Sequence, residues 1–255
     1  MQDWNPSLYR RFEDERTRPA AELLARVPLE APARVVDLGC GPGNSTELLV
    51  ARWPQAEVSG VDTSPAMLDA AAERLPGLVF VGGDIATWRP PVPVDVAYAN
   101  AALQWVPDHE RLLPRLVDAL APGGVLAVQM PDNLDEPSHV AMRETASEPR
   151  FATHIGDAAA VRARILSATG YYDLLAPSCD VDVWRTTYHH VMDDADAIVD
   201  WLRATGLKPF VEALPADLRP AFVAAYRERI EAAYPRRADG RRLLAFPRLF
   251  IVARR

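Results

Sequence analysis

The sequence predicts an α/β protein built on a doubly wound, mostly parallel sheet, and three observations lead to that prediction. Short apolar runs alternate with segments of helical length over the first half of the chain. A loop with glycine at every second position follows the first apolar run, and aspartates stand at the ends of three runs. Strand–helix–strand alternation of this kind is typical of parallel sheets with helices on both faces.

The first five apolar runs are rich in Val, Leu and Ala. They predict strands over 34–38, 57–61, 79–82, 94–99 and 124–129. Buried parallel strands carry continuous apolar sequence, as VVDL and VDVAYA do in the first and fourth runs. Helical periodicity predicts helices over 44–52, 65–74 and 108–120, and a further helix over 16–27 before the first strand.

The second half of the chain reads differently. We expect a helix over 157–169, a sixth strand over 178–183, a helical stretch over about 194–234 and a seventh strand over 249–253. An interval as long as the one between the last two strands rarely lacks structure of its own and often covers a site. The sequence therefore predicts a core domain of residues 1–183 with 248–255, and a helical insertion, or cap, of residues 184–247.

Composition excludes several classes of protein. The chain has 255 residues, of which 49% are hydrophobic, and a formal net charge of −7, so we expect no nucleic-acid partner. Its only cysteines, Cys40 and Cys179, predict neither a disulfide framework nor a metal site, and they favour a reducing compartment. The N-terminal stretch is charged, and the apolar runs are strand-sized. We therefore expect a cytoplasmic protein with no membrane partner.

The segment RVVDLGCGPGNS carries the strongest local signal. Asp37 closes the first strand, and Gly39, Gly41 and Gly43 follow it at every second position. Glycines let a backbone turn tightly and approach a ligand without a Cβ in the way. Asn44 stands where a dinucleotide fingerprint has its third glycine, which disfavours an NAD-dependent dehydrogenase. A purely structural tight turn is the alternative interpretation.

Two further aspartates support a nucleoside site. Asp62 ends the second strand, where a carboxylate suits the two hydroxyls of a ribose, and Asp84 follows the third strand beside Ile85. An acid and an aliphatic side chain at that point suit an adenine amino group and its ring. Isolated aspartates of this kind usually form turns or helix caps. Three of them at the carboxyl ends of successive strands predict a shared ligand site.

The motifs DLGCGPG, VDTSPAML, GGDI and ANAALQWVPD resemble those of the class I S-adenosylmethionine-dependent methyltransferases. Over nearly the whole chain, the segments DWNPSLY, RPAAELLARVPLE, MPDN, VWRTTYHH, DWLRATGLKPF and LLAFPRLFIVARR resemble the bacterial trans-aconitate 2-methyltransferases. The resemblance implies seven strands, with the last antiparallel and inserted between the fifth and the sixth. It also implies S-adenosylmethionine as cofactor and S-adenosylhomocysteine as its product.

The resemblance assigns cofactor contacts to residues at the ends of the first four strands. The methionine moiety would lie against Asp37, Gly39, Gly41 and Gly43. The ribose would meet Asp62, with Thr63 and Met67 nearby. The adenine would lie between Asp84 and Ile85. The sulfonium side would face Asn100, Gln104 and Trp105.

The implied reaction methylates a carboxylate of trans-aconitate or a related small di- or tricarboxylate and forms a monomethyl ester. A carboxylate is ionised at neutral pH, so we expect no acid–base catalyst and only an orienting role for Trp105 and His109. Candidates for acceptor binding are arginines and polar aromatics, because guanidinium groups grip carboxylates. They are Tyr9, Arg18, Trp105, Arg185, Tyr188 and Arg248. Arg18 has two candidate roles, since it could instead meet the cofactor's own carboxylate.

Other functions remain as alternatives at this stage. They are another small-molecule or acyl-carrier-linked carboxyl methyltransferase, and a non-catalytic module that binds S-adenosylmethionine. We expect a monomer without a metal, whose N-terminal segment 1–30 covers the cofactor as it does in the enzymes that the chain resembles. The sequence does not specify which carboxylate of an asymmetric acid is esterified.

Overall fold

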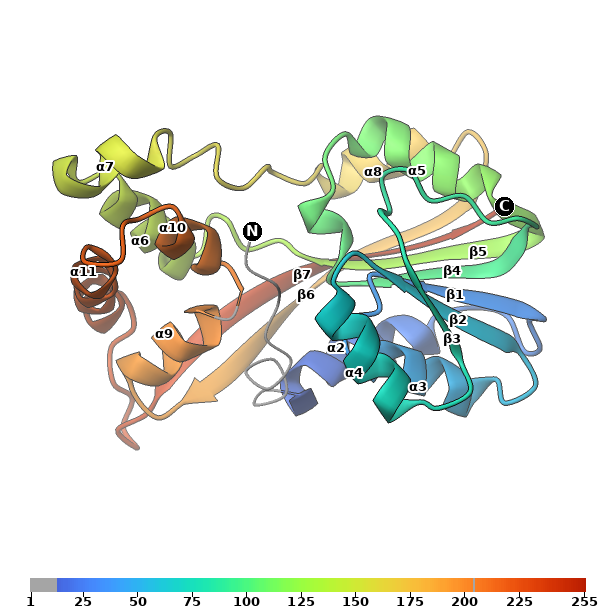
Figure 1. Cartoon of the computed structure of the whole chain (residues 1–255), viewed down its shortest axis with the longest axis horizontal. Helices are drawn as coiled ribbons and strands as arrows, with labels where there is room; N and C mark the ends of the chain where they lie inside the picture. The colour runs from blue at the N-terminus through green and yellow to red at the C-terminus, as the bar shows by residue number, and fades with distance from the viewer. Residues whose placement is uncertain (1–12, 204) are drawn as a thin grey trace. The chain divides into compact units, whose positions relative to one another are not determined.

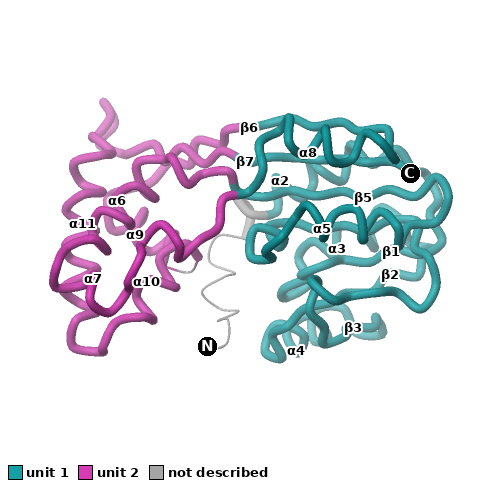
Figure 2. The backbone as a smooth tube through the Cα atoms, turned by 90° about the horizontal axis from the view of Figure 1, so that it is seen from above, with its two compact units in different colours: residues 1–131, 165–186, 248–255 teal, residues 132–164, 187–247 magenta. Residues whose placement is uncertain are grey.

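The computed structural model describes residues 13–203 and 205–255, which divide into two compact units. Unit 1 takes the chain up to Pro131, Ile165–Thr186 and Arg248–Arg255. Unit 2 takes Asp132–Arg164 and Thr187–Pro247. Figure 2 shows unit 1 in teal and unit 2 in magenta. Unit 2 therefore includes residues 132–164, which lie outside the cap expected from the sequence.

The sheet has seven strands in the order β3-β2-β1-β4-β5-β7-β6. Their bounds are β1 Arg34–Leu38, β2 Glu57–Asp62, β3 Val79–Gly82, β4 Val94–Asn100, β5 Leu120–Pro131, β6 Asp180–Met192 and β7 Arg242–Arg254. Strands β1 to β5 pair in parallel, and β7 pairs antiparallel with β5. The prediction of a mostly parallel seven-stranded sheet with the last strand between the fifth and sixth is confirmed.

The helices of unit 1 cover both faces of its sheet. They are α2 Glu13–Ala25, α3 Asn44–Arg52, α4 Pro65–Arg74, α5 His109–Asp118 and α8 Ala168–Leu175. Figure 1 shows α5 and α8 on one face and α2, α3 and α4 on the other. This arrangement confirms the doubly wound architecture and leaves the strand ends to form a ligand site.

The central strands of unit 1 are buried on both faces, which explains their continuous apolar sequence. In β1, Val35, Val36 and Leu38 are almost completely buried. Tyr98 in β4 is also fully buried, and its hydroxyl donates to the carbonyl oxygen of Ala20 in α2 at 2.6 Å. The core therefore lies between the sheet and its helices, and the parallel strands direct their carboxyl ends to one edge.

Unit 2 is helical, apart from its segments of β6 and β7. Its helices are α6 Pro137–Ala146, α7 Pro149–Ile155, α9 Ala195–Arg203, α10 Lys208–Glu212 and α11 Arg219–Ala233. Three aromatic rings form part of its core, with Phe222 edge-on to Phe151 and stacked against Phe210. Tyr226 of α11 donates to the carbonyl oxygen of Ser138 at 3.2 Å and ties α11 to α6.

Some predicted elements differ from the structure. The helix predicted over 157–169 is wrong, because helix α8 begins only at Ala168, where Ser167 caps it by accepting from the Gly170 amide at 3.0 Å. Strand β6 extends to Met192, so Arg185 and Tyr188 lie within it and not beyond it. No helix among residues 13–203 and 205–255 has the length and apolar character that a membrane crossing requires.

Candidate active site

The loop after β1 is held against the end of β2 by backbone hydrogen bonds. The Gly39 amide donates to the carbonyl oxygen of Val61 at 2.7 Å, and the Gly41 amide donates to Asp62 Oδ2 at 2.9 Å. Asp62 Oδ1 accepts from the Ser64 amide at 2.9 Å. Each carboxylate oxygen has a second lone pair for a ligand hydroxyl. The Asp62 carboxylate therefore fixes the loop and can still accept from a ligand.

The glycines of this loop all have positive φ, but their surroundings differ. Gly39 has a φ of 74°, and an added Cβ there would lie 2.4 Å from the Ala102 Cβ and 3.5 Å from Ile85 Cδ1. Gly41 has a φ of 53°, and an added Cβ would have no atom of the described chain within 4 Å. Gly39 therefore permits close packing against the end of β4, whereas Gly41 borders open space that a ligand can fill.

Asp37 lies behind the loop and is fully buried. Its Oδ2 accepts from the hydroxyls of Ser45 and Thr46, both at 2.7 Å, which anchors the start of α3. Burial raises the pKa of Asp37 to about 6, although the two hydroxyl bonds act in the opposite direction. Because Asp37 is buried behind the loop, it would act on a ligand indirectly, by holding the loop in position and by its negative charge.

The adenine candidates stand at the end of β3. Asp84 is exposed, and its Oδ1 accepts from the Ala86 amide at 2.8 Å, while Ile85 is buried beside Gly39. Arg115 of α5 donates to the carbonyl oxygens of Ile85 at 2.7 Å and Ala86 at 2.9 Å. These bonds hold the turn in place next to the glycine loop.

The ribose neighbours stand at the start of α4. Thr63 is exposed, and Met67 is buried, with its amide donating to the Ser64 hydroxyl at 3.2 Å. The structure therefore brings the candidates from β1, β2 and β3 to one edge of the sheet. The predictions for Thr63 and Met67 as ligand contacts stay predictions.

Some of the buried polar atoms without a hydrogen-bond partner lie at the end of β4, just after it, and at the start of α3. Within residues 13–203 and 205–255, Asn100 Oδ1, Gln104 Oε1 and both side-chain polar atoms of Asn44 make no hydrogen bond. Leaving such a group unpaired costs about 1–3 kcal/mol. In the sequence, Asn44 indicates only that a dinucleotide site is disfavoured. Its burial at the first residue of α3 was not readable from the motif.

His109 is engaged within the protein. Its Nδ1 lies 2.6 Å from the Tyr171 hydroxyl and its Nε2 lies 2.8 Å from the carbonyl oxygen of Leu103. Both ring nitrogens are thus used to join α5 to α8 and to the turn Leu103–Trp105. Trp105 in that turn is 39% exposed. Of the two orienting candidates, Trp105 has the more accessible side chain.

The acceptor candidates are spread over several elements. Arg18 on α2 is exposed and pairs with Glu22 at 2.8 Å. Arg248 in β7 is buried and donates to Gln129 Oε1 at 3.0 Å. Arg185 is exposed on β6, whereas Tyr188 is buried in the part of β6 that belongs to unit 2. Tyr9 lies outside the described residues.

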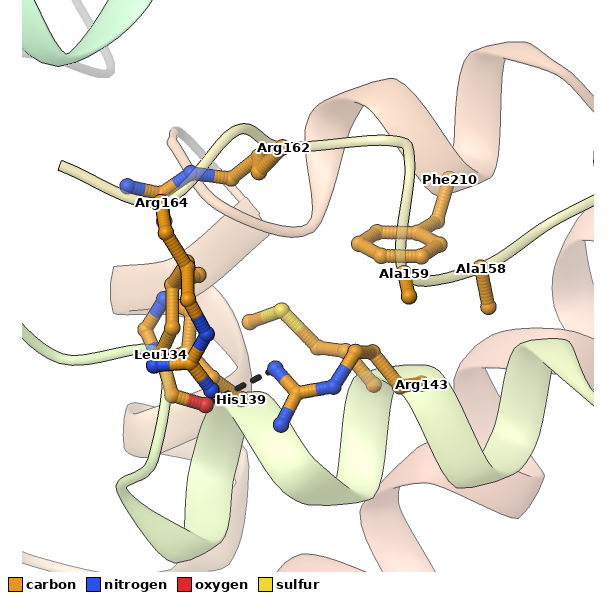
Figure 3. A pocket seen from close by; sticks show the side chains of 9 residues that line it. Leu134, His139, Arg143, Ala158, Ala159, Arg162, Arg164 and Phe210 are labelled. Carbon is orange, nitrogen blue, oxygen red and sulfur yellow. Dashed lines mark hydrogen bonds between the residues drawn. The ribbon is translucent and has the colours of Figure 1, made fainter.

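A second polar cluster, which the sequence reasoning missed, lies in unit 2. A pocket there is lined by Leu134, His139, Met142, Arg143, Ala158, Ala159, Arg162, Arg164 and Phe210. Figure 3 shows side chains that reach the pocket from α6 and the segment before it, from the loop after α7 and from α10. Arg162 and Arg164 fall within the helix predicted over 157–169, which does not form. Their position beside one pocket could therefore not be predicted from the sequence. Among residues 13–203 and 205–255, no group of three or more His, Cys, Asp or Glu residues is placed to hold a metal.

Comparison with known proteins decides the family. A family model described as a methyltransferase domain matches residues 9–211. The chain belongs to this methyltransferase family. The class I fold that uses S-adenosylmethionine, predicted from the loop and its downstream motifs, is confirmed by this match and by the strand order.

Curated relatives match this methyltransferase along its whole length. A protein named trans-aconitate 2-methyltransferase from Paracidovorax citrulli is 66% identical, and the match covers 100% of this chain and 99% of the relative. A protein of the same name from Methylobacterium radiotolerans is 64% identical with the same coverage.

Solved structures share the fold at low sequence identity. The YcgJ protein from Bacillus subtilis is 15% identical with a TM-score of 0.61, and the match covers 93% of this chain and 98% of that one. An S-adenosylmethionine-dependent methyltransferase from Thiobacillus denitrificans, solved with S-adenosylhomocysteine, is 20% identical with a TM-score of 0.54. That match covers 94% of this chain and 91% of the other.

Proposed function

We propose that this methyltransferase transfers a methyl group from S-adenosylmethionine to a carboxylate oxygen of trans-aconitate and so forms a monomethyl ester. The observation that carries the proposal is the full-length identity of 66% and 64% to two proteins named for this reaction. The family supplies the reaction type, and the names of these relatives supply the acceptor.

The edge formed by β1, β2 and β3 fits the cofactor. Gly41 leaves space for a ligand next to the backbone, and Asp62 keeps acceptor capacity for ribose hydroxyls. Asp84 and Ile85 flank the position proposed for the adenine. When bound, the cofactor supplies a methyl group activated by a positively charged sulfur. Asn100 and Gln104 would accept hydrogen bonds through their unpartnered oxygens.

The proposed reaction does not require acid–base catalysis by the protein. A carboxylate attacks in its ionised form, so its oxygen needs no general base. The buried His109 fits this requirement, since both of its ring nitrogens are bonded within the protein. The remaining demand is to align the attacking oxygen with the methyl group and to exclude water.

Acceptor binding is proposed to use arginines on the carboxylates that do not react. Tight binding of the attacking carboxylate would stabilise the ground state and slow the transfer. Arg248 is the strongest of the candidates in unit 1, because its guanidinium group is buried and charge–charge contacts strengthen away from water. Arg185 on β6 and Trp105 after β4, which also belong to unit 1, are proposed as further contacts.

The test is a transfer assay with labelled S-adenosylmethionine and a panel of acids. The panel contains trans-aconitate, its cis isomer, the saturated tricarboxylate and a monocarboxylate. We expect a base-labile methyl ester with trans-aconitate and much slower transfer to the monocarboxylate, which lacks the anchoring groups. Equal rates over the panel, or label released only as a base-stable product, would refute the acceptor assignment.

We also propose that the enzyme acts as a monomer on a free small acid in the cytoplasm. Cys40 and Cys179 are free thiols, which a reducing compartment maintains. Sedimentation should give the mass of one chain, 28.1 kDa. A stable dimer at micromolar concentration would contradict the proposed oligomeric state.

A further inference from the structure

The pocket in unit 2 has the size and lining of a ligand site. Its volume is about 70 Å³. A single water needs a cavity of only about 10–15 Å³ on a comparable measure, so this pocket can admit a group of several atoms. Three arginines, at positions 143, 162 and 164, reach it from α6 and from the loop between α7 and α8. Figure 3 shows these side chains around the pocket.

The lining is positively charged. Among the described residues that line the pocket there is no aspartate or glutamate. Arg164 forms a two-pronged ion pair with Asp135, with distances of 2.8 and 2.5 Å. Arg143 donates to the carbonyl oxygen of Leu134 at 2.8 Å, which is a neutral partner. Arg143 and Arg162 both line this pocket, and its lining residues include no aspartate or glutamate.

Burial and the nearby positive charges lower the pKa of both Arg162 and His139 in this pocket. Burial, and secondarily the charge of Arg143, lowers the pKa of Arg162 to about 10, so Arg162 stays charged at neutral pH. Burial lowers the pKa of His139 to about 3, with Arg162 and Arg143 acting in the same direction. His139 is therefore neutral, and the positive charge of the pocket belongs to its arginines. An anion in the pocket would face these cations in surroundings partly removed from water.

The other side of the pocket is apolar. Leu134, Met142, Ala158 and Phe210 all contribute to the lining, and Met142, Ala158 and Phe210 are almost completely buried. Inorganic phosphate would gain nothing from these side chains, whereas a carbon chain would be removed from water against them. A site with paired guanidinium groups and an apolar wall favours an organic anion.

We propose that this pocket binds a small organic polycarboxylate, with Arg143 and Arg162 paired with its carboxylates and Met142 and Phe210 packed against its carbon chain. The inference concerns equilibrium binding within unit 2 and does not depend on which acid the enzyme methylates. Arg164 supports the site by holding the loop through Asp135.

The test is a calorimetric titration of the full chain, without cofactor, with trans-aconitate, the saturated tricarboxylate and inorganic phosphate. The variants are Arg143→Gln and Arg162→Gln, and the control is Arg203→Gln, an exposed arginine of α9 in the same unit. We expect both pocket variants to bind the acids roughly tenfold or more weakly, because each loses a charged hydrogen bond. The control should bind as the wild type does.

A second readout places the ligand. The ring signals of His139, identified by comparison with His139→Gln, should shift in the magnetic resonance spectrum when the acid is added at neutral pH. Thermal unfolding of each variant checks that the fold is intact. Wild-type affinity in both pocket variants, an unshifted His139 signal, equal affinity for phosphate, or no binding of either acid would overturn the proposal.

The two proposals fail separately. If the acids bind in an Arg162-dependent manner but no methyl ester forms, the proposed function is wrong and the pocket assignment stands. If the ester forms while Arg143→Gln and Arg162→Gln bind the acids normally, the pocket assignment is wrong and the proposed function stands.

Discussion

At the scale of single residues, two glycines of one loop serve different purposes. Gly39 packs against Ala102, with no room for a Cβ, whereas the space beside Gly41 is empty of described atoms. Both have positive φ, which costs an L residue about 1–2 kcal/mol. The sequence motif treats the two glycines alike, and only the structure separates a packing role from a ligand-facing one.

The first prediction compares Gly39→Ala with Gly41→Ala. Gly39→Ala should lower the free energy of unfolding by about 2–5 kcal/mol, since overpacking adds to the backbone strain. Gly41→Ala should cost only about 1–2 kcal/mol but weaken S-adenosylhomocysteine binding, because its methyl group enters the ligand's space. Urea denaturation and calorimetry measure the two effects. Wild-type affinity in Gly41→Ala would place the ligand elsewhere.

The second prediction concerns Asp62. Asp62→Asn replaces an acceptor oxygen with a donor next to the amides of Gly41 and Ser64, and it removes the charge. We expect S-adenosylhomocysteine to bind roughly tenfold to a hundredfold more weakly, as for other charged hydrogen bonds. Asp69→Asn, at an exposed site on α4, is the matched control and should bind normally. Equal affinity in the two variants would remove Asp62 from the site.

At the scale of elements, the predicted strands and helices of the first half agree closely with the structure. The reason is that β1, β2 and β3 alternate with α3 and α4 through short, clearly marked turns. Helices α6 and α7 were not predicted, although prolines stand at their first positions, Pro137 and Pro149. Helix α7 has only seven residues, too few for a periodic pattern.

The segment 157–169, for which a helix was predicted, is turned and irregular up to Ser167. Gly156 ends α7 with a φ of 73°, and Arg162 then points into the unit 2 pocket. Spaced apolar residues in this segment imitate helical periodicity, but residues 158–161 form turns, 163–167 are irregular, and Arg162 lines the pocket beside residues of α6 and α10. Local patterns cannot anticipate such contacts, because they join residues far apart in the sequence.

The third prediction tests the link between α5 and α8. Tyr171→Phe removes the hydroxyl that bonds to His109 and accepts from the Leu166 amide at 3.2 Å. We expect a loss of about 1–3 kcal/mol in the free energy of unfolding, because buried polar groups lose their partner. The rate of methyl transfer should stay near that of the wild type. Tyr172→Phe, at a neighbouring side chain that is 52% exposed, should change neither quantity.

A different result would change the role of His109. If Tyr171→Phe left stability unchanged but strongly reduced the maximal rate, His109 would act on the acceptor. The hydrogen bonds at both ring nitrogens argue for the structural role. The motif alone, which places His109 just after Trp105, suggested an orienting role because it carries no information on burial.

At the scale of the whole molecule, the two units should respond to acid in opposite directions. In unit 1, the folded-state pKa of Asp37 is about 6, above its usual 3.8, so its contribution to stability falls as the pH rises through 6. In unit 2, the folded-state pKa of His139 is about 3, below its usual 6.5. The neutral His139 therefore contributes to the stability of unit 2 above pH 6.5, and this contribution is lost as the pH falls from 6.5 towards 3.

The fourth prediction follows from these signs. Between about pH 7 and about pH 5, Asp37 should add about 1–2 kcal/mol to the stability of unit 1, and His139 should remove a similar amount from unit 2. Hydrogen exchange in each unit measures this, with Asp37→Asn and His139→Gln as variants. Each variant should lose the pH response of its own unit and keep that of the other. An acid response in unit 2 that survives in His139→Gln would contradict the assignment.

The candidate site was partly predictable from sequence. Asp62, Asp84 and the glycine loop could be placed at one edge because parallel strands end together. The partners of Asp37 and the unpartnered oxygens of Asn100 and Gln104 could not, since burial and hydrogen bonding depend on the packed structure. In the unit 2 pocket, Arg143 comes from α6 while Arg162 and Arg164 come from the loop before α8, and no spacing rule relates the helix to the loop.

The most direct test of the account is a crystal structure of the full chain with S-adenosylhomocysteine. We expect the ribose hydroxyls within hydrogen-bond distance of Asp62, the adenine beside Asp84 and Ile85, and the amino-acid portion over Gly41. A ligand bound away from these three strand ends, with Asp62 still bonded only to backbone amides, would contradict the account.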